Sequence, residues 1–170
     1  MQSMNPRMAV RSMDLRWKPL DSGVYKVNFD GALFLDQRCA GLGVVVRDSV
    51  GLVMAALSQR VRLPGSADVV EALAACRAIC FAQELSLHNV VIEGDSLKVI
   101  QAIIDTSLVQ TLYGHIIDEI RLLSSSFICN FLHVNRKGNK LAHALARRTI
   151  LSDDTDVWIE ELPRDLEDVV

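Results

Sequence analysis

The chain has 170 residues, of which 50% are hydrophobic and 23% are charged, and it carries a net charge of −3. This length suits one globular domain with a single well-developed core. No apolar run approaches the roughly 18 residues that cross a bilayer, which argues against a membrane partner and favours an intracellular protein of the nucleus or cytoplasm.

Residues 1–16 contain three arginines, opposed only by Asp14. The segment lacks the apolar block of a secretory signal and faintly resembles an organelle transit peptide. We favour a flexible leader, or the point at which the chain joins a longer parent protein. The domain itself is expected to span residues 17–150.

Alternating or continuous apolar runs predict five strands, and apolar residues at helical spacing predict four helices. Residues 24–30 alternate between apolar and polar side chains, and turn residues at 48–51 join the next two strands into a hairpin. A Pro-Gly-Ser break at 64–66 precedes a helix that Asp68 can cap. The predicted strands cover residues 24–30, 41–47, 52–58, 90–93 and 127–134. The predicted helices cover residues 68–85, 96–104, 112–124 and 139–150.

The resulting order, βββαβααβα, is typical of an α/β fold in which a mixed five-stranded sheet is flanked by helices. Residues 151–170 follow as an acidic C-terminal extension, with eight acids against Arg164. The chain without this extension carries a net charge of +4. We expect the extension either to dock as a short helix or to remain loose.

Three carboxylates stand at the edges of apolar runs, where an isolated charge is costly to desolvate. Asp30 ends the first predicted strand, Glu71 lies in the first turn of the long helix, and Asp95 follows the fourth strand. If the two strands are neighbours, the three acids meet, and such a cluster suits a hard divalent cation, Mg²⁺ or Mn²⁺. Each acid also has a local alternative: a turn residue for Asp30, a capping box with Asp68 for Glu71, and a helix cap for Asp95.

A basic segment lies between residues 136 and 148 and contains no acid. Its cations suit the phosphates of a nucleic acid, and a solvated helix face is the alternative interpretation. The basic residues are Arg136, Lys137, Lys140, Arg147 and Arg148.

Five stretches together resemble a ribonuclease H (RNase H) domain of the reverse-transcriptase-like branch found in plant genomes and their retroelements. They are 25–32 (YKVNFDGA), 40–48 (AGLGVVVRD), 71–75 (EALAA), 93–96 (EGDS) and 133–146 (HVNRKGNKLAHALA). The resemblance implies an RNase H-like fold and a metal-dependent endoribonuclease that hydrolyses the RNA strand of RNA/DNA hybrids. Two divalent ions, Mg²⁺ or Mn²⁺, are implied with it. The family's first three catalytic acids and metal ligands carry over onto Asp30, Glu71 and Asp95.

One position departs from the family pattern, because His143 stands where these enzymes place a fourth aspartate near the start of the last helix. A neutral imidazole can ligate a divalent ion and suits Mn²⁺ better than Mg²⁺. We therefore include His143 among the candidate catalytic and metal-ligating residues, with a partly buried polar residue as the alternative. Asn139, one helical turn earlier, is a candidate contact to a metal or to the nucleic-acid backbone, and Asn28 is a candidate contact to RNA hydroxyls.

A second departure concerns substrate binding. Bacterial relatives bind the hybrid through a basic helix and loop, whereas residues 105–111 of this chain contain no basic residue. Binding of the hybrid would therefore depend on the basic segment 136–148. Three hypotheses follow: a hybrid-cleaving nuclease, a nucleic-acid-binding domain in which His143 has weakened or abolished catalysis, and a purely structural α/β domain. We expect a monomer, and its membership in a larger retroelement-derived protein stays open.

Overall fold

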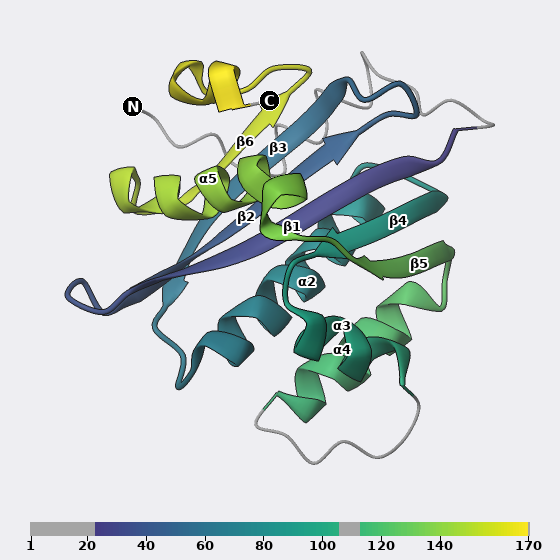
Figure 1. Ribbon diagram of the computed structural model, residues 1–170, viewed down its shortest axis with the longest axis horizontal. Helices are drawn as coiled ribbons and strands as arrows, with labels where there is room; N and C mark the ends of the chain where they lie inside the picture. Colours follow the sequence, from purple (N-terminus) through teal and green to yellow (C-terminus); the bar gives the residue numbers. More distant parts are fainter. Residues whose placement is uncertain (1–22, 106–112, 170) are drawn as a thin grey trace.

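The computed structural model describes residues 23–105 and 113–169, and over this part of the chain a six-stranded sheet carries helices on both faces (Figure 1). The strands are β1 (Tyr25–Phe34), β2 (Cys39–Arg47), β3 (Val53–Arg62), β4 (Asn89–Gly94), β5 (Ile128–His133) and β6 (Thr155–Ile159). The α-helices are α2 (Ala67–Glu84), α3 (Leu97–Ile104), α4 (Gly114–Ser124) and α5 (Lys140–Arg148). Short 3-10 helices are η1 (Arg136–Asn139), η2 (Thr149–Leu151) and η3 (Arg164–Val169).

The sheet order is β5-β4-β1-β2-β3-β6. β1 pairs antiparallel with β2 and parallel with β4, while β4 pairs parallel with β5. β3 pairs antiparallel with both β2 and β6. The predicted mixed sheet and the predicted order of its nine elements are confirmed. Because β1 and β4 run in the same direction, residues at the ends of both strands lie at one edge of the sheet.

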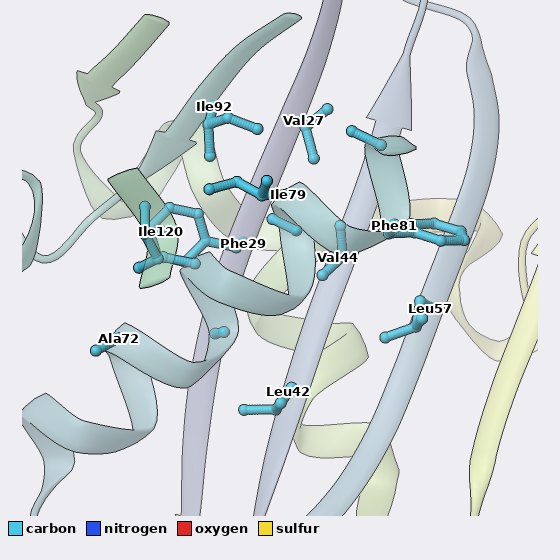
Figure 2. Close-up of a cluster of buried hydrophobic side chains, with 14 of the residues drawn as sticks. Val27, Phe29, Leu42, Val44, Leu57, Ala72, Ile79, Phe81, Ile92 and Ile120 are labelled. Carbon is cyan, nitrogen blue, oxygen red and sulfur yellow. The ribbon is translucent and has the colours of Figure 1, made fainter. Parts of the chain in front are cut away.

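One face of the sheet packs on α2 and buries most of the core. Figure 2 shows Val27 and Phe29 of β1 in one cluster with Val44, Ile79 and Ile92. All five are fully buried. The alternation of β1 thus directs its large apolar side chains toward α2 and its polar side chains to the opposite face.

The opposite face is covered by α5, which lies across β1, β2 and β3 (Figure 1). A side chain at Gly43 would collide with the carbonyl oxygen of Ala142 and the backbone nitrogen of Ala146, so the missing Cβ lets α5 approach β2. Leu145 of α5 is fully buried in this contact. Since Gly43 is the register partner of Asp30, the close contact brings α5 near that acid.

The predicted five-stranded sheet is incomplete, because β6 lies within residues 151–170, the segment predicted as an acidic extension. β6 pairs antiparallel with β3, and Val157 is buried against the core. Further on, Leu166 of η3 packs in the cluster beneath α5. The sequence did not reveal β6 because its few apolar residues stand among acids. An edge strand also needs apolar side chains on one side only, which weakens its pattern in the sequence.

In the described residues no helix combines the length and the apolar character that a bilayer span requires. The expected leader 1–16, the start of the domain at residue 17 and the link 106–111 lie outside the described residues. The helix expected from residue 112 is described from Gly114.

Candidate metal centre

Asp30 lies in the middle of β1, and the expectation that the strand ends there was wrong. On one side β1 continues to Phe34, because it stays paired with β2 along its length, including Asp30 with Gly43. On the other side, pairing with β4 stops at Asn28 and Glu93. Asp30, which is 3% exposed, therefore lies just beyond the last β4 pair.

Asp95 directly follows β4, so the parallel pairing of β4 with β1 carries it toward Asp30. The alternative role of Asp95 as a helix cap is contradicted, because α3 is capped by Ser96, whose hydroxyl accepts a hydrogen bond from the Val99 N–H at 3.4 Å. His133, at the end of β5, donates from Nε2 to the Asp95 backbone carbonyl oxygen at 3.3 Å. These contacts involve the Ser96 hydroxyl and the Asp95 backbone carbonyl, so neither of them uses the Asp95 carboxylate.

Glu71 reaches the site from the second turn of α2. The helix is capped by the hydroxyl of Ser66 and not by Asp68 as expected, so Glu71 is not part of a capping box. Instead, Oε1 of Glu71 accepts a hydrogen bond from the Gly31 N–H at 3.2 Å. Oε2 of Glu71 is buried and has no hydrogen-bond partner among the described residues.

The three acids converge, with one oxygen each from Asp30, Glu71 and Asp95 lying within 4.8 Å of the others. Burial, followed by the charge of Asp30, raises the pKa of Glu71 to about 10. Burial and the charge of Asp30 also raise the pKa of Asp95, against the opposing influence of Arg136 and His143. Both shifts reflect first the desolvation of buried carboxylates and second the repulsion between neighbouring negative charges.

This donor set fits a hard divalent cation, because carboxylate oxygens are the ligands that Mg²⁺ and Mn²⁺ prefer. The buried Oε2 of Glu71 supplies an acceptor that a cation would satisfy. The convergence predicted from the sequence for the three acids is confirmed.

His143 joins the acids from α5. Its Nδ1 lies 2.7 Å from Oδ2 of Asp30, and its side chain is 54% exposed. Because a carboxylate only accepts, the imidazole donates from Nδ1, and a neutral ring then keeps its lone pair on Nε2. In this arrangement His143 orients Asp30, and direct ligation of a metal by His143 stays a prediction.

A buried hydrogen-bond network ties the start of α5 to β1 and β4. Asn139 donates from Nδ2 to the Phe29 carbonyl oxygen at 2.9 Å, and its Oδ1 accepts from Asn28 at 3.1 Å. Asn28 Nδ2 also lies 3.2 Å from Oε2 of Glu93. Asn28 and Asn139 are each 1% exposed, so their burial contradicts the prediction that they contact nucleic acid. Their amides instead hold the helix that carries His143.

Three of the predicted basic residues surround the site. Arg136, Lys137 and Lys140 are exposed and line a hollow together with Asp95 and His143. Their cations therefore lie beside the carboxylates, where a phosphate would meet both.

The two arginines at the end of α5 have other contacts. The Nε of Arg148 donates to both carboxylate oxygens of Asp165, at 3.0 and 3.2 Å, and its guanidinium covers the Trp158 ring at 5.1 Å. These contacts leave its side chain 14% exposed and favour a structural role for Arg148, and its predicted contact with nucleic acid stays a prediction. Arg147 is exposed over the Phe34 ring at 5.6 Å, and its predicted role stays a prediction.

Sequence reasoning assigned no role to three charged residues near the site. Glu93 is 7% exposed and forms an ion pair with Lys26 at 3.5 Å. Arg47, the register partner of Lys26, donates to Oδ1 of Asn28 at 3.5 Å. A signal was present, since Glu93 interrupts an apolar strand and Lys26 alternates with Asn28 and Asp30 on one side of β1.

Comparison with curated protein sequences finds no match. Among solved structures, the chain is similar to RNase H1 from the halophilic archaeon Halobacterium salinarum, with a TM-score of 0.69 and 21% identity over 75% of this chain and 97% of that chain. It is also similar to the N-terminal RNase H domain of a Mycobacterium tuberculosis protein, with a TM-score of 0.67 and 22% identity over 76% and 94% of the two chains. LC11-RNase H1 from compost, in complex with an RNA/DNA hybrid, gives a TM-score of 0.66 and 20% identity over 75% and 99%. These similarities confirm the RNase H-like fold.

The family match covers residues 28–149. This range contains the three converging acids, His143 and the buried network that positions α5. The chain belongs to the reverse transcriptase-like family.

Proposed function

We propose that this protein is a metal-dependent endoribonuclease that hydrolyses the RNA strand of RNA/DNA hybrids. The observation that carries the proposal is the convergence of Asp30, Glu71 and Asp95 on an RNase H-like fold. The hybrid bound by LC11-RNase H1, a structural neighbour, supports this choice of substrate. The exposed cations beside the acids suit a polyanionic substrate.

In the proposed site Asp30, Glu71 and Asp95 would hold the divalent cations. Bound there, two divalent ions would supply activation of water and stabilisation of the leaving 3′ oxygen. The chain contributes orientation, since the Gly31 N–H fixes Glu71 and His143 Nδ1–H fixes Asp30. Arg136, Lys137 and Lys140 would hold the phosphates, and no protein nucleophile is needed.

We further propose that the ions are Mg²⁺ or Mn²⁺, and that the site prefers Mn²⁺ more strongly than a site with four acids would. A fourth acid would add a negative oxygen ligand, whereas His143 adds a neutral nitrogen, which suits Mn²⁺ better than Mg²⁺. Rates measured in each metal alone would show this preference.

The test is cleavage of a hybrid with a labelled RNA strand, in Mg²⁺ and in Mn²⁺, by the wild type and the Asp95→Asn variant. Loss of a metal ligand removes several kcal/mol of transition-state stabilisation, which corresponds to a rate loss of roughly 10²- to 10⁴-fold. Asp118→Asn is the matched control, because Asp118 is an exposed acid on α4. Equal cleavage by the wild type and Asp95→Asn would rule out the proposed site.

A second candidate is a nucleic-acid-binding domain with weak or lost catalysis, and it is favoured by one observation. His143, which stands in place of the fourth acid, is hydrogen-bonded to Asp30. This hypothesis expects hybrid binding without turnover in the wild type. It also expects the His143→Asp variant to gain Mg²⁺-dependent cleavage, whereas unchanged activity in that variant would show that His143 is not the limiting defect.

A further inference from the structure

Three hollows follow one another along the surface, from the metal centre to the start of β1. The first, described above, is lined by Lys137 and Lys140 beside the acids. The second is also lined by Lys137 and Lys140, and adds Arg47 and Asp168. The third is lined by Arg47 and Lys26. Because each hollow shares lining residues with the next, the three adjoin.

Five basic residues line this path, and we call them the cationic track. They come from η1, α5, β2 and β1, and are therefore placed together only by the fold. They are Arg136, Lys137, Lys140, Arg47 and Lys26.

The far end of the track is fixed by the strand pairing of β1 with β2. Lys26 and Arg47 are register partners, and their cations both interact with groups of the buried network. The Lys26 side chain stays 53% exposed despite its ion pair with Glu93, which is itself buried. A ligand in the third hollow would thus meet the lysine head group while the carboxylate lies beneath it.

In the described part of the chain, three acids line the path, against five basic residues, and one of these acids, Asp95, belongs to the metal centre. Asp48, in the third hollow, accepts hydrogen bonds from the Val50 and Leu52 N–H groups at 3.0 and 2.9 Å. Asp168 of η3 is the acid that faces Arg47 and the two lysines in the second hollow. Among the described residues that line the three hollows there is no Phe, Tyr or Trp, and the one imidazole, that of His143, lies at the metal centre. Beyond the first hollow the surface therefore offers charge to phosphates and no aromatic platform for stacked bases.

We propose that the cationic track binds the phosphodiester backbone of one substrate strand outside the cleaved step. This inference rests on the proposed function, since it assigns the continuation of the nucleic acid bound at the metal centre. It adds Arg47 and Lys26, which lie beyond the basic segment 136–148, to the binding surface. Asp168 acts against binding, because it places a negative charge between three of the cations.

The experiment measures binding of non-cleaved hybrids in EDTA by fluorescence anisotropy, with a short hybrid and a long one. The Lys26→Gln/Arg47→Gln double variant should weaken binding of the long hybrid by roughly tenfold, and should lower the slope of log Kd against log salt by about 0.9 for each phosphate that the protein no longer neutralises. Binding of a hybrid too short to leave the first hollow should not change. Arg164→Gln and Asp36→Asn are the controls, because both residues are exposed and line none of the three hollows.

A second variant keeps the test informative if the double variant is destabilised. Asp168→Asn removes the opposing charge from an exposed segment, and should tighten binding of the long hybrid while leaving the short one unchanged. Thermal unfolding of each variant separates loss of fold from loss of binding.

The outcomes separate this inference from the proposed function. If the wild type binds the hybrid but does not cleave it in Mg²⁺ or Mn²⁺, the proposed function is contradicted and the proposed role of the cationic track in binding is not. A wild type that cleaves, with long-hybrid affinity unchanged in both the double variant and Asp168→Asn, would overturn the track alone. Equal weakening by the Arg164→Gln control would also overturn it, because the effect would then be one of overall charge.

Discussion

Alternate residues of β1 lie in two different surroundings. Val27 and Phe29 are fully buried in the apolar core against α2, whereas Asn28 and Asp30 face α5 and take part in hydrogen bonds. The same ten-residue strand therefore contributes stability on one face and the candidate site on the other. Substitutions on the two faces are expected to separate these contributions.

The largest loss of stability is expected from Phe29→Ala. The ring is fully buried in the main cluster (Figure 2). It also lies against Gly94, the residue directly before Asp95. Truncating a buried phenylalanine costs about 3–5 kcal/mol. Urea unfolding of the variant and the wild type would measure this loss. Asp30→Asn, the adjacent change on the other face, should keep metal-free stability within about 1 kcal/mol and abolish cleavage. Similar destabilisation by both variants would contradict the separation of the faces.

Gly43→Ala tests the contact that holds α5 over β2. The added methyl would collide with backbone atoms of Ala142 and Ala146, and overpacking of this kind costs about 1–3 kcal/mol. Cleavage should fall as well, because α5 carries His143 to Asp30. Gly65→Ala is the control, since a methyl there meets open space. Unfolding midpoints and hybrid cleavage check both expectations.

Asn139→Ala breaks the buried network on the polar face. It removes the partners of the Asn28 amide and of the Phe29 carbonyl, and unpaired buried polar groups cost about 1–3 kcal/mol. We expect kcat to fall more than KM rises, because the substitution displaces α5 and touches no substrate. A selective rise in Kd for the hybrid would instead restore a direct binding role for Asn139.

Glu71→Gln should raise the stability of the metal-free protein. The pKa of Glu71 rises from an ordinary 4.5 to about 10, so the folded wild type retains a proton that the unfolded chain releases. Metal-free stability therefore falls as pH rises between these two values. The variant should lose this slope, gain a few degrees in Tm near neutral pH, and lose most of the Tm increase that Mn²⁺ gives the wild type. Calorimetry with EDTA and with Mn²⁺ is the measurement, and a wild-type slope retained in Glu71→Gln would contradict the assignment.

The smallest effect is expected from Arg148→Gln. Arg148 pairs with Asp165 and covers Trp158, and such an ion pair near the surface contributes about 0–1 kcal/mol. Hybrid affinity should be unchanged, whereas Lys140→Gln, the same change in charge near the acids, should weaken it. Equal losses of affinity in the two variants would return Arg148 to the nucleic-acid-binding surface.

Local patterns were sufficient to predict most elements and the convergence of the three acids. Periodicity identifies strands and helices from neighbouring residues. Asp30 and Asp95 could be placed together only on the condition that their strands are neighbours, which the pairing of β1 with β4 fulfils. Caps were less certain, since Ser66 and Asp68 are both suitable residues and the choice depends on where the first helical turn closes. The sixth strand escaped notice because Val157 and Trp158 stand among acids that dominate the composition.

The sequence by itself determined the order of nine elements and the identity of the acids and, through the family resemblance, the replacement of a fourth acid by His143. Only the tertiary structure decided that β1 runs past Asp30, that Asn28 and Asn139 are buried partners, that Arg148 is engaged, and that Lys26 and Arg47 line a path from the metal centre. The physical reason is that helix and strand preferences act between near neighbours in the chain. Burial and hydrogen bonding of polar side chains depend on segments such as β1 and η1, which are distant in sequence and meet only when the sheet and α5 pack together.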